Sequence, residues 1–126
     1  MEKKRYEVDI KDKCFHFSIE LMKVLKEIEK SRLNTVIVDQ LARSGTSIGS
    51  NVVESQASSS TKELIRYYRI ALKSTYESVY WLKILRFFSK DYEDKFDQLI
   101  IEAEEIRKIV TSIIFKLEQK MEFFKS

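Results

Sequence analysis

Few side chains in this chain are suited to metal or nucleophilic chemistry. Cys14 and His16 are its lone cysteine and lone histidine, and a separation of two positions places them on different sides of a helix. A tetrahedral metal site takes four such ligands, and a di-iron bundle takes a Glu-x-x-His motif from each of two helices. The sequence therefore predicts no metal site and no cofactor. The lone cysteine suits a reducing compartment, so we expect the cytoplasm.

Polar side chains recur at helical spacing over residues 44–54. The members of this set, at i, i+3, i+7 and i+10, are Ser44, Ser47, Asn51 and Glu54. They have no histidine at a plausible partner position, and the chain has neither a G-x-S-x-G motif nor a glycine-rich phosphate loop. We therefore expect no catalytic residue and a protein that is not an enzyme. The set is interpreted as a hydrogen-bond network that fixes the register of helices or subunits, with substrate binding as the alternative.

Basic side chains form a row on residues 60–88. Lys62, Arg66, Arg69 and Lys73 follow spacings of four, three and four, which puts them within an arc of roughly 60° on one helix. We call these four residues the basic stripe. A row of cations suits phosphate backbones and predicts salt-sensitive, sequence-tolerant binding of RNA or DNA, with Arg43 as a further contact. The alternative is a solvated face, or one that pairs with acidic residues of a neighbouring subunit.

The charge distribution and nearby aromatic residues bear on this hypothesis. Residues 60–90 contain seven basic and two acidic residues, whereas residues 91–122 contain nine acidic and five basic ones. The formal net charge of +3 is too small to indicate nucleic-acid binding by itself. Tyr67, Tyr68 and Tyr76 lie near the basic stripe in sequence and offer stacking surfaces for bases.

Composition and periodicity predict the elements that position these residues. The chain has no proline and two glycines, which disfavours turn-rich β folds and leaves long helices. Apolar spacing predicts helices over residues 12–30, 35–55 and 60–88 and a fourth up to about residue 120. Short connections make neighbouring helices antiparallel, so the predicted fold is all-α, an antiparallel up-and-down four-helix bundle. The predicted organisation is a flexible arm over residues 1–11, the bundle over 12–120 and a tail over 121–126.

Two helices carry features that predict close packing. Gly45 and Gly49 both fall inside the second predicted helix, at a cost of about 1 kcal/mol each against alanine, which indicates close approach of another backbone. The third predicted helix has an apolar arc wider than one core seam requires, which suggests burial against both the bundle and a second subunit. No apolar stretch reaches the length of a membrane span and no signal peptide is recognisable, so we expect no membrane association.

Residues 40–54 and 60–82 resemble the four helix bundle protein family, also called the 23S ribosomal RNA intervening-sequence proteins. The family pattern is roughly Q-L-x-R-S-x-x-S-I-x-x-N-(I/V)-x-E, then a Ser-rich link and a helix that ends near Glu-x-x-x-W-L. The matching residues are Gln40, Leu41, Arg43, Ser44, Ser47, Ile48, Asn51, Glu54, Ala71, Glu77, Trp81 and Leu82. Val53 and Ser55 stand where the family often has alanine and glycine.

The resemblance implies a four-helix bundle of bacterial origin that assembles as a ring-shaped homopentamer. It also implies a relative that assists a reverse transcriptase in diversity-generating retroelements by binding nucleic acid through a basic surface. Two function hypotheses follow. The first is an oligomeric module that binds RNA or DNA backbones through the basic stripe. The second is a protein-interaction scaffold, for example an accessory subunit of a polymerase-type partner, without a direct nucleic-acid role.

Overall fold

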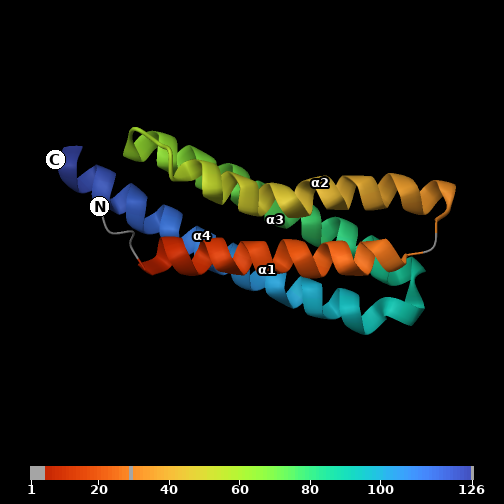
Figure 1. Ribbon diagram of the computed structural model, residues 1–126. Helices are drawn as coiled ribbons and strands as arrows, with labels where there is room; N and C mark the ends of the chain where they lie inside the picture. The colour runs from red at the N-terminus through yellow and green to blue at the C-terminus, as the bar shows by residue number, and fades with distance from the viewer. Residues whose placement is uncertain (1–4, 29, 126) are drawn as a thin grey trace.

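Four long helices and one short helical turn make up the described part of the chain, residues 5–28 and 30–125, in this computed structural model (Figure 1). Their bounds are Arg5–Glu27 for α1, Arg32–Ser55 for α2, Thr61–Phe88 for α3 and Glu93–Lys125 for α4, with the 3-10 turn η1 at Lys90–Tyr92. These residues include no strand. None of the described helices has the length and apolar character needed to cross a membrane.

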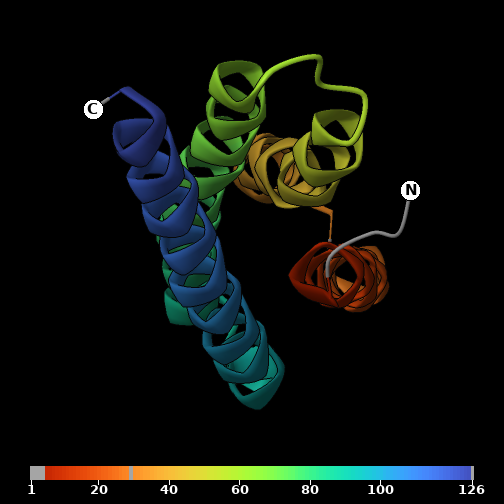
Figure 2. The ribbon, with the colours of Figure 1, turned by 90° about the vertical axis from the view of Figure 1, so that its left-hand side faces the viewer.

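The helices form the antiparallel up-and-down four-helix bundle that the sequence predicted. Helices α1 and α3 each contact both α2 and α4, whereas no Cα atoms of the described residues lie within 8 Å of each other across the α1–α3 or α2–α4 diagonal. The connections are short, so each helix returns alongside its predecessor. Figure 2 faces the end of the bundle at which α4 finishes and the α2–α3 connection lies.

Serine hydroxyls begin two of the helices. The Ser31 hydroxyl accepts a hydrogen bond from the Asn34 amide at 3.1 Å, and the Ser60 hydroxyl accepts one from the Glu63 amide at 3.1 Å. Each bond satisfies an amide that has no partner within its helix. The Glu63 carboxylate accepts from the Ser59 hydroxyl at 3.0 Å, one residue before the position that a capping box would use.

The first and last helices, α1 and α4, extend further than the apolar spacing predicted. Helix α1 begins at Arg5, and Ile10 within it is fully buried. The predicted flexible arm is therefore wrong for residues 5–11, because burial of Ile10 stabilises two further helical turns; residues 1–4 lie outside the described residues. Helix α4 continues to Lys125, so most of the predicted tail is helical, and Met121 packs against the core.

The core confirms the periodicity of the fourth predicted helix. Its heptad-spaced residues all belong to the buried cluster: Phe96, Leu99, Ala103, Ile106, Val110, Ile113 and Leu117. Burial of this seam, at roughly 25 cal/mol per Å² of apolar surface, is the main force that holds α4 on α1 and α3.

The two glycines explain how closely α1 and α2 approach. A Cβ atom added at Gly49 would lie 3.2 Å from the Cys14 Cβ, and one added at Gly45 would overlap the Leu21 side chain. Since Cys14 and Leu21 both belong to α1, the predicted close helix contact is confirmed. Cys14 is buried there, and burial raises the pKa of its thiol to about 12.

The wide apolar arc of α3 is used within one copy of the chain. Leu82 and Leu85 on one flank are buried, as are Ile65 and Val79 on the other. Helix α3 lies between α2 and α4, and each neighbour covers one flank. Because these flanks are covered within one copy, the arc by itself does not indicate a second subunit, and self-association stays a prediction. Tyr76, on the same flank as Ile65 and Val79, is exposed, at 58%.

Candidate nucleic-acid interface

The basic stripe lies on the outer face of α3. All four of its side chains are exposed, and they lie opposite the helix face that buries Ala71 and Leu82. Helical geometry causes this separation, since residues on opposite faces differ by about 180° around the axis. The described structure therefore presents these cations to solvent.

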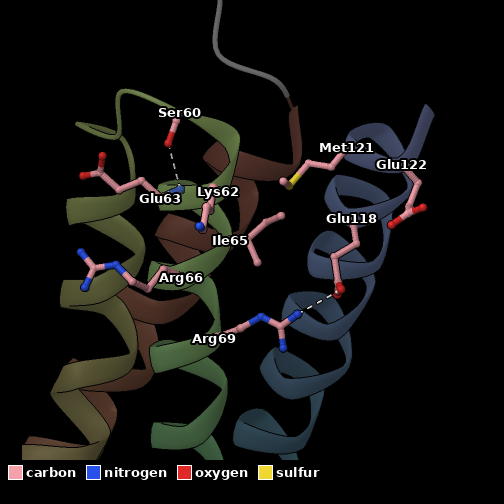
Figure 3. Close-up of a pocket in the computed structure, with 9 residues that line it drawn as sticks. All are labelled: Ser60, Lys62, Glu63, Ile65, Arg66, Arg69, Glu118, Met121 and Glu122. Atoms are coloured by element: carbon pink, nitrogen blue, oxygen red, sulfur yellow. Dashed lines mark hydrogen bonds and ion pairs between the residues drawn. The ribbon is translucent and has the colours of Figure 1, made fainter. Parts of the chain in front are cut away.

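A groove of about 570 Å³ runs beside the stripe, between the start of α3 and the end of α4 (Figure 3). Its lining residues are Ser60, Lys62, Glu63, Ile65, Arg66, Arg69, Glu118, Met121 and Glu122. Lys73 and Arg43 do not line it. Three members of the stripe thus form one wall, and the end of α4 contributes carboxylates and an apolar side chain to the other.

One cation of the stripe already has an anionic partner. Arg69 Nη2 lies 3.0 Å from Glu118 Oε2, with both side chains about half exposed. Lys62, Arg66 and Lys73 form no ion pair with a described residue, although the Arg66 guanidinium lies over the Tyr67 ring at 5.2 Å. Three of the four positive charges are therefore available to an anionic ligand.

The carboxylates of α4 are more often paired than the cations of α3. Arg86 of α3 contacts Glu93 at 2.9 Å and also binds Asp97, whose hydrogen bond is the main cause of a raised Arg86 pKa. Lys13 of α1 lies 2.7 Å from Glu105 and lowers the pKa of that carboxyl, chiefly by hydrogen bonding. Part of the negative charge of α4 is thus neutralised by ion pairs within the fold. The carboxylates of α4 therefore offset less of the positive electrostatic potential around the basic stripe.

Arg43 is exposed on α2, apart from the groove. Its neighbour Ser44 is hydrogen-bonded to Ser78, which is five residues beyond Lys73 on α3. At 1.5 Å per residue, Ser78 lies about 7–8 Å from Lys73 along the axis of α3. The structure therefore does not bring Arg43 together with the groove-lining members of the stripe.

The polar set on α2 forms a network with α3, but with fewer members than predicted. The Ser78 hydroxyl donates to Ser44 Oγ at 3.0 Å, and the Ser74 hydroxyl donates to Ser47 Oγ at 3.1 Å. Asn51 Nδ2 donates to Ser47 Oγ at 3.0 Å. These bonds set the register of two helices of one chain.

Glu54 is not part of this network. It is exposed and its carboxylate forms no hydrogen bond with another described side chain. The α3 partners Ser74 and Ser78 were missed from sequence. Their spacing of four, among apolar neighbours, is the signal that would have identified them.

The three tyrosines near the stripe have different environments. Tyr68 is 1% exposed and cannot stack on a base. Tyr67 is half-buried beneath Arg66. Tyr76 is exposed but lies against Arg107 of α4, whose guanidinium carbon is 5.8 Å from the ring centre. Only Tyr76 therefore presents most of its ring to solvent.

The groups considered for metal chemistry are dispersed. The described residues contain no cluster of three His, Cys, Asp or Glu side chains that would hold a metal ion. His16 is exposed, with its Nε2 at 3.5 Å from Glu102 Oε1 of α4, whereas Cys14 is buried against α2. The two residues thus face different neighbours.

The sequence and the fold of this chain are similar to those of known proteins. Residues 6–112 match the family described as 23S rRNA-intervening sequence protein. A crystal structure of a protein with unknown function from the S23 ribosomal protein family, from Bacteroides thetaiotaomicron VPI-5482, is similar with a TM-score of 0.79 and 30% sequence identity. The similarity covers 86% of this chain and 97% of that one. No curated protein matches. The chain belongs to the 23S rRNA-intervening sequence protein family.

Proposed function

We propose that this protein is a binding module, not an enzyme, and that it holds RNA or DNA backbones non-specifically through the basic stripe. The observation that carries the proposal is the exposure of four aligned cations on α3, three of which form no ion pair with a described residue. Phosphate contacts of this kind supply sequence-independent affinity that falls with salt. The cytoplasm is the proposed compartment.

Self-association would strengthen such binding. The ring-shaped homopentamer implied by the family resemblance remains part of this proposal. Repeating a weak stripe around a closed assembly raises the effective concentration of each further contact, so modest single-site affinity gives useful avidity. An exposed apolar row on α1 supports an association surface away from the stripe: Phe15 and Met22 are 69% and 47% exposed.

Charge reversal tests the nucleic-acid proposal. Replacing all four residues of the stripe by Glu should abolish binding to single-stranded RNA at low salt, measured by fluorescence anisotropy. The matched control carries four exposed lysines of other surfaces changed to Glu: Lys26, Lys30, Lys108 and Lys116. It has the same net charge and should retain most of the binding. Equal loss in both variants, or none in the first, would refute the proposal.

A protein-interaction scaffold is the second candidate. The apolar row on α1 supports this candidate. Single exposed apolar residues are common on protein surfaces, but residues at i, i+4 and i+7 together make one helix face apolar, and contiguous apolar surfaces mark interaction sites. The row is Phe15, Ile19 and Met22. If a Phe15→Ser and Met22→Ser variant stays monomeric in sedimentation while the wild type does not, the row joins copies of this chain. An unchanged assembly leaves a different protein as its partner.

A further inference from the structure

The outer face of α3 changes from cationic to aromatic beyond Lys73. Tyr76, Tyr80 and Phe87 are 58%, 61% and 67% exposed. At 100° per residue, these rings and the basic stripe fall within an arc of roughly 80°, so they form one row. From Lys62 to Phe87 the row is about 38 Å long at 1.5 Å per residue.

Cations also surround the aromatic part of this row. Lys83 and Lys90 are exposed, and Lys90 Nζ lies 5.8 Å from the centre of the Phe87 ring. Residues 74–90 contain one acidic residue, Glu77, whose carboxylate accepts a hydrogen bond from Trp81 Nε1 at 3.1 Å. The aromatic end of the face therefore carries positive charge as well as exposed rings.

We infer that the ligand of α3 is a single-stranded nucleic acid, whose phosphates contact the basic stripe and whose bases stack on Tyr80 and Phe87. This inference rests on the proposed function and narrows its ligand class. Proteins that bind single strands without sequence preference combine a cationic track with aromatic side chains on which successive bases stack. A duplex keeps its bases stacked on one another, so it offers its phosphates to the stripe and no base face to the rings.

The charge pattern favours this ligand over a protein surface. Protein interface cores are enriched in Tyr and Phe but depleted in Lys, because desolvating an unpaired ammonium is costly. Here Lys73, Lys83 and Lys90 lie in and around the aromatic segment. A phosphate chain would neutralise these charges while its bases cover the rings, so a single strand satisfies both kinds of side chain.

Trp81 provides a direct optical probe of this surface. It is the lone tryptophan, and its ring centre lies 5.2 Å from that of Tyr80 in an edge-to-face arrangement. A base that stacks on Tyr80 would come close to Trp81 and quench its fluorescence. A ligand held only by its phosphates near Lys62 would leave the Trp81 emission unchanged.

The test compares three ligands of equal length under one salt condition. They are oligothymidine of about twelve nucleotides, an abasic oligomer with the same number of phosphates, and a DNA duplex. The length of the oligothymidine is within the usual range of single-strand binding sites. Oligothymidine should bind at least about fivefold more tightly than the abasic oligomer, from the stacking of one base alone. It should also quench Trp81, whereas the abasic oligomer should not.

Variants connect this preference to the rings. Tyr80→Ala and Phe87→Ala should each reduce the advantage of oligothymidine over the abasic oligomer, and the double variant should remove it. Phe115→Ala is the matched control, because Phe115 is 60% exposed on α4, and it should leave the ratio unchanged. Both single variants alter exposed rings, and their thermal unfolding verifies that the fold is retained.

Each outcome has a distinct meaning. Equal affinity for oligothymidine and the abasic oligomer would overturn this inference while leaving the proposed function standing. Absence of binding to all three ligands would refute both. If Tyr80→Ala and Phe87→Ala instead dissociate an oligomer in sedimentation and leave the ligand ratio unchanged, the rings form a protein contact and the inference is overturned.

Discussion

Arg69 on α3 and Glu118 on α4 form an ion pair at 3.0 Å across the groove that borders the basic stripe (Figure 3). The pair joins two helices, and it also occupies one cation of the surface proposed to bind phosphate. Both side chains are about half exposed, so the pair contributes little to stability. Its main consequence is competition, since a phosphate that binds Arg69 must displace the Glu118 carboxylate.

Substitution of Glu118 should therefore improve nucleic-acid binding. Glu118→Gln keeps the shape of the side chain and removes the competing charge, and we expect a roughly two- to fivefold gain in affinity, in line with exposed ion pairs. Fluorescence anisotropy with labelled single-stranded RNA measures the change. The control is Glu105→Gln, which removes a carboxylate of α4 that pairs with Lys13. Weaker binding by Glu118→Gln would contradict competition at Arg69.

The Ser44–Ser78 hydrogen bond should couple α2 and α3. Both hydroxyls are buried and lie 3.0 Å apart. Each single change to Ala should lower the free energy of unfolding by about 1 kcal/mol, because the remaining hydroxyl loses its bond to the other helix and keeps only a carbonyl of its own helix. The double variant should be less destabilised than the sum of the two, as chemical denaturation will show. Additive losses would mean that the bond does not couple the helices.

Gly49 should tolerate a large side chain poorly. Its absent Cβ leaves room for Cys14 of α1, whose own Cβ cannot move without its helix. Gly49→Leu should lower the free energy of unfolding by about 1–3 kcal/mol or more through overpacking. Ser50→Leu, on the exposed neighbouring position, serves as the comparison and should have a small effect. A stable Gly49→Leu variant would show that α1 and α2 can separate at this point.

The Cys14 thiol should be unreactive in the folded protein. Burial raises its pKa from 9.0 to about 12, so little thiolate is present at neutral or mildly alkaline pH. Because the folded pKa is the higher one, this thiol stabilises the fold fully below about pH 9, and the contribution is lost as the pH rises toward 12. Reaction with a thiol reagent should require unfolding. Rapid labelling of native protein at pH 8 would contradict the buried position.

Much of the fold could be predicted because periodic apolar residues determine it. The row from Phe96 to Leu117 has helical spacing without interruption, and every predicted member is buried. The glycines were equally informative, since a helix that contains Gly45 and Gly49 must have a close neighbour. Helix starts were harder to predict: Ser60 begins α3 as expected, whereas α1 starts before Asp12 because tertiary burial of Ile10 extends it.

The candidate site was predictable only on α3. Spacing within one helix puts the four residues of the stripe on a common face, and they are exposed. The opposite wall of the groove depends on how α4 lies beside α3, which residue spacing within either helix does not determine. Glu118 and Met121 were therefore missed. Arg43, predicted as a further phosphate contact, lies on α2 apart from the groove.

The salt dependence of binding tests the central claim most directly. For single strands, log K falls by about 0.7 per neutralised phosphate per unit of log salt, so four engaged cations predict a slope near −3 for one copy. Changing the four residues of the basic stripe to Gln should remove about that much of the slope, while the same change of Lys26, Lys30, Lys108 and Lys116 on other surfaces should keep it. An unchanged slope in the stripe variant would show that nucleic acid, if bound, is held elsewhere on the protein.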